Sequence, residues 1–294
     1  MQYKNIIRIL GLLVALLSVT MLPPALVSMI YRDGGGVPFL LGFLWCLVTG
    51  FVAWYPNRYQ KTDLRAREGF LIVVLFWLVL ASFSAIPLIL LEQPSLSITD
   101  AFFESFSGLT TTGATILNHI EGLPHAVLWY RQQLQWLGGM GIIVLAVAVL
   151  PMLGIGGMQL YRAETPGPVK DSKMTPRIAD TAKHLWYIYL SLTIACAVAY
   201  WLAGMSGFDA ICHSFSTIAI GGFSTHDASM GYFNSPTINL VCVFFLVISG
   251  VNFALHYAVV QSKSLKNYFY DPEFKVFIAI QVVLALICFT VLIS

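Results

Sequence analysis

Seven long apolar stretches constrain this chain more than any other feature of its sequence. A helix that crosses a bilayer needs about 20 mainly apolar residues, because the hydrocarbon core is about 30 Å thick and a helix rises about 1.5 Å per residue. The stretches of this length are Ile6–Ile30, Val37–Tyr55, Phe70–Leu91, Val127–Leu153, Leu185–Met205, Ile238–Val260 and Phe274–Ile293. They predict an all-α integral membrane protein. The first stretch is too long for a cleaved secretory signal, so we expect it to be retained as a span.

Composition excludes several other classes. Hydrophobic residues make up 58% of the 294 positions and charged residues only 10%, whereas soluble domains carry about 25% charge. The formal net charge of +2 is too small and too scattered for a nucleic-acid partner. The five cysteines match no metal-binding or disulfide spacing. We therefore expect membrane lipid around the chain and no nucleic acid bound to it.

The basic residues predict the orientation of the chain. With alternating spans, nearly all of the 16 Lys and Arg residues fall on one side of the membrane. Only Arg32 and Arg131 fall on the other. By the positive-inside rule the basic side is cytoplasmic, so the N-terminus is expected inside the cell, in a multi-pass protein.

Two interrupted segments share one pattern. The segment Asp100–Gly113 (DAFFESFSGLTTTG) aligns without a gap with Asp209–Gly222 (DAICHSFSTIAIGG), and six of the 14 positions are identical. Each begins as a short helix, for which Thr99 or Asp100 is the expected N-cap in the first segment. Each continues into residues that form helix poorly. Internal similarity of this kind is typical of membrane folds built from repeats.

The chemistry of such a unit favours cations. A half-helix that enters from outside points the negative end of its dipole at the middle of the membrane. The irregular loop that follows can aim backbone carbonyls at a dehydrated cation, and glycine permits the backbone angles that this needs. Glu104 on the first half-helix has two readings that the sequence leaves open: it attracts cations, or it is a structural partner of Arg131 or of a backbone donor.

Four motifs, in this order, resemble one known family. They are Asp100–Thr115 (DAFFESFSGLTTTGAT), Gln135–Ile142 (QWLGGMGI), Met158–Lys170 (MQLYRAETPGPVK) and Ile218–Asp227 (IAIGGFSTHD). The chain resembles the N-terminal part of the TrkH-type potassium uptake subunits, which belong to the Trk/Ktr/HKT superfamily of cation translocators. The resemblance extends over essentially the whole chain.

The resemblance implies a specific organisation. Four helix–pore-loop–helix repeats surround one potassium pathway in that family, after an N-terminal helix pair. Carried over, this gives a helix pair with a cytoplasmic loop at 1–69, repeat 1 at 70–157, a cytoplasmic loop at 158–184, repeat 2 at 185–262, and the first helix of an incomplete third repeat at 263–294.

The resemblance also implies the site and the partners. The carbonyl filter comprises Thr111, Thr112, Gly113, Ile220, Gly221 and Gly222, flanked by Thr110 and Ala219, with K⁺ expected at Thr111, Thr112, Ile220 and Gly221. A one-residue slip of the alignment would exchange the roles of Gly221 and Gly222. The implied function is potassium uptake across a bacterial inner membrane. Potassium is the transported substrate and no organic cofactor is expected. The implied partners are a TrkA-like nucleotide-binding regulatory subunit in the cytoplasm and a second copy of the chain.

Two pore loops cannot encircle an ion, so the sequence leaves alternatives. We expect a fragment of a longer protein; the alternative is a two-loop chain that forms a pore only as a dimer. A non-transporting assembly or receptor subunit is a further alternative, although such a subunit has no need of two irregular segments at one depth. An enzyme is not expected, because spans three to seven carry no carboxylate near their centres and no G-x-S-x-G motif occurs.

Other features have simpler interpretations. Gly138, Gly139 and Gly141 are expected to allow close helix packing, and His213 to be packed and hydrogen-bonded. The glycines near Gly156 lack the strand that a nucleotide-binding loop requires. The loop at 158–184 is expected to bind either a regulatory subunit or anionic lipid. Replacing Gly113 with Ser is predicted to weaken potassium selectivity.

Overall fold

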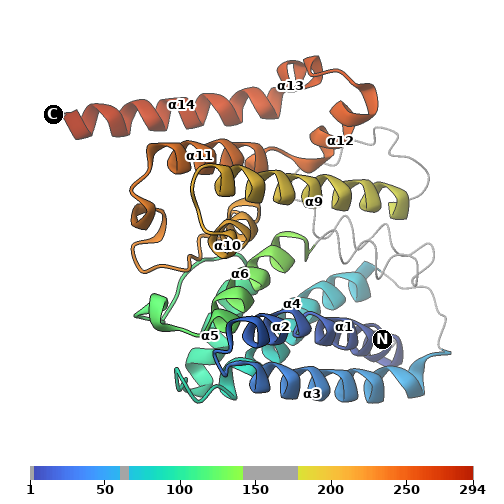
Figure 1. The fold of residues 1–294 in the computed structure, drawn as a ribbon. Coiled ribbons are helices and arrows are strands. Elements are labelled where there is room, and N and C mark those ends of the chain that lie inside the picture. Colours follow the sequence, from blue (N-terminus) through green and yellow to red (C-terminus); the bar gives the residue numbers. More distant parts are fainter. Residues whose placement is uncertain (1–2, 60–65, 142–177, 294) are drawn as a thin grey trace.

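The protein is all-helical wherever its structure is described. The computed structural model describes residues 3–59, 66–141 and 178–293, and no strand occurs in these ranges (Figure 1). The α-helices with both ends in these ranges are α1 (Tyr3–Val19), α2 (Leu22–Tyr31), α3 (Gly36–Trp54), α4 (Ala66–Ile89), α5 (Ile98–Leu109), α6 (His125–Gly139), α9 (Ile178–Leu202), α10 (Gly207–Ile218), α11 (Pro236–Gly250), α12 (Phe253–Ser262), α13 (Lys266–Tyr270) and α14 (Pro272–Ile293). The prediction of an all-α membrane protein is confirmed.

Most of the predicted spans coincide with helices of the described ranges. Five apolar helical segments are long enough to cross a membrane, and the bent pair α11 and α12 adds a sixth if it counts as one span. The predicted span at 127–153 is described only as far as residue 141, where α6 has already ended. The glycines near Gly156 and most of the predicted loop at 158–184 lie outside the described residues. Helix α9 begins at Ile178, earlier than the expected end of that loop.

The first apolar stretch forms two consecutive helices and not one. Helix α1 ends at Val19 and α2 begins at Leu22. Pro23 and Pro24 lie in the first turn of α2, where backbone N–H groups have no partner within the helix, so that their loss costs nothing. The same two prolines would interrupt a helix that continued from α1. The two helices together still give one candidate span from Tyr3 to Tyr31.

Helices α1 and α3 cross closely because glycine faces glycine there. A Cβ on Gly11 would lie 2.7 Å from the backbone N of Trp54. A Cβ on Gly50 would lie 2.5 Å from the backbone N of Ala15. Small residues at such a crossing let the two backbones approach each other. The pair therefore forms a tight N-terminal support, against which α4 also packs.

Two helix–short-helix–helix units follow the N-terminal helices. The first comprises α4, α5 and α6, and the second comprises α9, α10 and α11. Helix α6 contacts both short helices, α5 and α10 (Figure 1). One buried hydrophobic cluster extends through α1 to α6, and a second links the end of α6 with α9, α10 and α11. Helix α6 therefore joins the two units.

The predicted span Ile238–Val260 is wrong as a single helix. Helices α11 and α12 meet at an angle of 88°. Gly250 ends α11, and the Asn252 side chain accepts a hydrogen bond of 3.0 Å from the backbone N–H of Ala254. Asn252 is thus the N-cap of a new helix. The Gly-Val-Asn sequence is the physical reason for the break.

Candidate functional site

The two short helices have the same construction. Helices α5 and α10 each contain 12 residues. Ser97 and Ser206 are their N-caps, and each hydroxyl accepts a hydrogen bond of 3.1 Å from the backbone N–H three residues later. The expectation of Thr99 or Asp100 as the N-cap was therefore wrong, because the serine precedes them and its oxygen reaches the free N–H first. Each helix is about 18 Å long, roughly half of a bilayer.

Both short helices also end in the same way. The residue after the C-cap, Thr111 or Ile220, has a φ of 55° or 53°. The next N–H reaches back five residues: Thr112 to the Ser107 carbonyl at 2.9 Å, and Gly221 to the Ser216 carbonyl at 2.8 Å. This arrangement is a Schellman motif, in which the left-handed residue is usually glycine. Here it is β-branched in both loops.

Matching glycines follow in the two loops. Gly113 has a φ of 77° and Gly222 a φ of 87°. Gly221 is not among the residues of the described chain with a positive φ. The backbone conformation therefore agrees with the ungapped alignment, in which Gly113 is opposite Gly222. A Cβ on Gly113 would overlap the carbonyl oxygen of Gly221. The two loops therefore touch at this point.

The predicted filter residues differ in their exposure. Ile220 is 49% exposed; Thr110, Thr112 and Gly222 are also exposed, and Thr111 and Gly113 are half-buried. Ala219 and Gly221 are buried. The structure thus brings all eight predicted residues into two adjoining loops at the ends of α5 and α10 and leaves four of them accessible.

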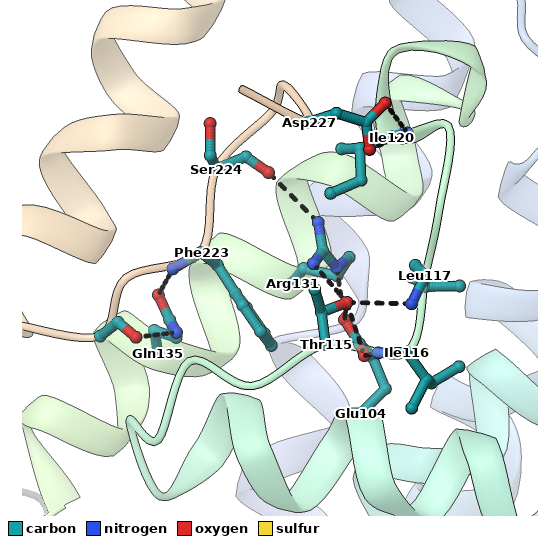
Figure 2. A network of polar contacts seen from close by, with 11 residues as sticks. Glu104, Thr115, Ile116, Leu117, Ile120, Arg131, Gln135, Phe223, Ser224 and Asp227 are labelled. Carbon is teal, nitrogen blue, oxygen red and sulfur yellow. Dashed lines mark hydrogen bonds and ion pairs between the residues drawn. The ribbon is translucent and has the colours of Figure 1, made fainter. Parts of the chain in front are cut away.

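A buried ion pair lies behind the loops. Arg131 Nε of α6 donates to Glu104 Oε1 of α5 at 2.6 Å, and both side chains are fully buried. The Thr115 hydroxyl donates to the same carboxylate at 2.9 Å and accepts from Arg131 Nη2 at 3.0 Å. Arg131 Nη1 donates to the Ser224 carbonyl at 3.2 Å. Figure 2 shows Arg131 between these partners.

This network supports the structural reading of Glu104. Its carboxylate also accepts from the Ile116 N–H at 3.3 Å, and it is enclosed by protein. A buried, paired carboxylate offers no free charge to a cation at the loops. The network connects α5, the first loop, α6 and the second loop, so it fixes the two loops relative to each other.

Helix α6 lies against the ends of both short helices because two glycines permit it. A Cβ on Gly138 would overlap the Leu109 carbonyl oxygen at the end of α5. A Cβ on Gly139 would lie 2.9 Å from the Ala219 Cβ, just after α10. Gly141 meets Trp77 of α4 in the same way. The expectation that these glycines serve packing is therefore supported by the geometry.

The outer ends of the two loops are also joined. The Asp227 carboxylate accepts from the Ile120 N–H, with both oxygens at 3.2 Å.

Two histidines of the second unit are packed against neighbouring side chains. The His226 ring stacks on Tyr232 with 3.5 Å between centroids. His213 Nδ1 contacts the Asp209 carbonyl at 2.9 Å and its Nε2 contacts the Ser224 hydroxyl at 3.0 Å. His213 is thus packed and hydrogen-bonded, as expected.

One buried polar side chain that contacts the second loop received no role from the sequence. Gln135 is fully buried on α6 and contacts the second loop. It belongs to one of the four motifs, but nothing assigned its amide a partner. The available signal was the run of polar side chains on α6, which has Arg131, Gln132, Gln133 and Gln135 within five residues. Polar side chains at membrane depth commonly mark functional positions. Within the described residues, no three His, Cys, Asp or Glu side chains form a group that could hold a metal ion.

The fold and the site define an all-helical membrane protein in which short helices end in irregular loops that meet one another. The family model for TrkH, described as "Cation transport protein", matches residues 36–294. The chain belongs to this family. Its relatives are transport proteins and not enzymes.

Similar proteins extend beyond this chain. A Trk system potassium uptake protein TrkH of Vibrio parahaemolyticus is 66% identical over 296 residues, covering 100% of this chain and 61% of the relative. The TrkH protein of Escherichia coli K12 is 63% identical and covers 99% of this chain and 60% of the relative. The crystal structure of the potassium transporter TrkH from Vibrio parahaemolyticus matches with a TM-score of 0.87 and 62% identity, over 100% of this chain and 60% of that one. The chain therefore spans about three fifths of the length of the relatives it matches.

Proposed function

We propose that the complete protein takes up potassium across the bacterial inner membrane as the translocating subunit of a Trk system. One observation carries the proposal: two short helices end in loops of matching backbone conformation that meet at Gly113 and Gly221. The relatives named potassium uptake proteins support the choice of ion.

The proposed filter uses backbone carbonyls of both loops. They belong to Thr111, Thr112 and Gly113 in the first loop and to Ile220, Gly221 and Gly222 in the second, flanked by Thr110 and Ala219, with K⁺ at Thr111, Thr112, Ile220 and Gly221. Such oxygens replace the water shell of the ion. The Gly221 carbonyl already accepts a hydrogen bond from Gln135, so it would offer K⁺ only its second lone pair. The membrane potential supplies about 2.3 kcal/mol per 100 mV for each charge moved inward.

The proposed setting includes partners that the sequence resemblance implies. These are a TrkA-like nucleotide-binding regulatory subunit on the cytoplasmic side and a second copy of the protein. The distribution of basic residues supports a cytoplasmic N-terminus. The loop at 158–184 is proposed as a contact for either the regulatory subunit or anionic lipid.

Uptake into liposomes tests the proposal. The 294-residue chain and the product of the longer reading frame that contains it are each reconstituted, and ⁸⁶Rb⁺ uptake is measured with and without competing potassium. We expect uptake by the longer product that potassium suppresses and sodium suppresses far less. Uptake by the 294-residue chain alone would mean that two copies pool their loops. A potassium-independent signal, or no uptake by either form, would overturn the proposal.

A further inference from the structure

The Gln135 side chain holds the second loop at two points. Its Nε2 donates to the Gly221 carbonyl at 2.7 Å, and its Oε1 accepts from the Phe223 N–H at 3.0 Å (Figure 2). The two hydrogen bonds bracket Gly222, whose φ of 87° lies in the left-handed region. One amide thus fixes the peptide groups on both sides of the exposed glycine of the loop.

The amide also explains why the second loop carries two consecutive glycines. A Cβ on Gly221 would lie 2.8 Å from Gln135 Nε2 and still closer to the other amide atoms. Only glycine leaves room for the amide against the backbone. The corresponding residue of the first loop is Thr112, which is exposed. Its hydroxyl contacts that of Thr110 at 2.8 Å, so the first loop uses its own side chains where the second relies on α6.

Gln135 acts beside Arg131. The two residues are four positions apart on α6 and so share one face of the helix. Arg131 holds the Ser224 carbonyl, while Gln135 holds the two residues on either side of Gly222. Helix α11, which has the place in the second unit that α6 has in the first, contains neither Gln nor Arg. Of these two helices of the described chain, only α6 therefore carries the device.

We infer that Gln135 is a positioning residue that sets the cation discrimination of the second pore loop. The inference rests on the proposed potassium uptake. Carbonyls select an ion by the spacing and number of oxygens that they present to it. A loop that Gln135 no longer holds can close around a smaller ion, so sodium should gain most from its loss.

A matched pair of variants in the complete protein tests the inference. Gln135→Leu removes both hydrogen bonds to the loop. Gln132→Leu is the control, because Gln132 is also fully buried on α6 but its amide has no hydrogen-bond partner in the described part of the chain. We expect Gln135→Leu to lower the ratio of ⁸⁶Rb⁺ to ²²Na⁺ uptake in liposomes by about tenfold, and Gln132→Leu to leave it within about twofold. Thermal unfolding in detergent checks that both variants are folded.

A second variant guards against a loss of folding in Gln135→Leu. Gln135→Glu keeps an acceptor for Phe223, but its carboxylate faces the Gly221 carbonyl without a donor. In its acid form the side chain has a hydroxyl that can donate to Gly221 again. Acidification should therefore raise the uptake ratio of this variant toward that of the wild type, with no such rise in Gln135→Leu.

The outcomes separate the inference from the proposed function. Absence of potassium-sensitive uptake in the wild type refutes the proposed function. Normal wild-type uptake with equal ratios of ⁸⁶Rb⁺ to ²²Na⁺ uptake in Gln135→Leu and Gln132→Leu overturns the inference alone. The same holds if the uptake ratio of Gln135→Glu does not change with pH.

Discussion

Thr111 and Ile220 adopt a backbone conformation that β-branched residues seldom hold. Their φ angles of 55° and 53° place each in the left-handed region, at a cost of about 1–3 kcal/mol. The hydrogen bonds that close each Schellman motif and the packing of α6 offset this cost. Strain of this kind is typical of functional sites, and here it occurs at the same point of both proposed filter loops.

Two glycines with similar backbone angles should respond differently to a methyl group. Gly113 and Gly34 have φ angles of 77° and 74°, so alanine introduces about 1–2 kcal/mol of backbone strain at either position. Only at Gly113 would the Cβ also overlap the Gly221 carbonyl, whereas nothing lies within 4 Å of a Cβ on Gly34. We expect Gly113→Ala to lower the midpoint of thermal unfolding more than Gly34→Ala and to reduce the ⁸⁶Rb⁺/²²Na⁺ uptake ratio. Equal effects of the two substitutions would contradict the contact of Gly113 with the second loop.

At the scale of elements, the sequence predicted the short helices well because their pattern is local. The end of α5 before Thr110 follows from residues that form helix poorly, and the match of Gly113 with Gly222 follows from the ungapped alignment of the two segments. The N-cap was misplaced because Ser97, Thr99 and Asp100 are all capable caps, and only the backbone decides among them. The bend between α11 and α12 was missed because hydropathy does not report direction. Gln135 received no role because its partners lie more than 80 residues away.

The ion pair between α5 and α6 predicts a characteristic result for double substitution. Removing one member of a buried pair leaves an uncompensated charge and costs about 3–5 kcal/mol, whereas removing both costs less. Arg131→Met should therefore strongly reduce thermal stability, and Glu104→Gln in the same protein should restore part of the loss. The amide that this second substitution introduces would still accept hydrogen bonds from the Thr115 hydroxyl and the Ile116 N–H. The midpoints of unfolding of both single variants and the double variant, measured in detergent, provide the check. A double variant less stable than Arg131→Met would show that the pair is not the dominant interaction.

At the scale of the whole molecule, the described chain is packed tightly on one side and open on the other. Helix α6 is enclosed by α2, α5 and α10, while α14 has no buried residue. The N-terminal helices therefore support the loops through α6. The contact that ties them together outside the membrane spans is Asp33, between α2 and α3. Its carboxylate accepts from the Ser28 hydroxyl of α2 and from the N–H of Gly35 and of Ala126 near the start of α6, the last at 3.2 Å.

The charge of Asp33 should make the stability of the molecule depend on pH. Burial raises the pKa of the Asp33 carboxyl, but the hydrogen bonds from Ser28, Gly35 and Ala126 lower that pKa by more, so it lies below its usual value. A carboxyl with a lower pKa in the folded than in the unfolded state adds its full stabilisation above the unfolded-state pKa of about 4. That stabilisation is lost as the pH falls through the folded-state pKa.

Asp33→Asn should therefore destabilise the protein by about 1–3 kcal/mol near neutral pH. The difference should shrink as the pH falls from about 4 through the lower folded-state pKa, where the wild-type carboxyl also becomes neutral. Midpoints of thermal unfolding of wild type and variant in detergent, followed from pH 7 downward, measure the difference. Asp33→Asn can also disturb the first turn of α6, because the Asp33 carboxylate accepts from the Ala126 N–H there. Ser28→Ala is therefore a second variant, which removes one hydrogen-bond donor to Asp33 and keeps the charge of Asp33. It should show a smaller loss with the same pH trend. A constant gap between Asp33→Asn and the wild type across this range would show that the charge of Asp33 does not link the N-terminal helices to α6.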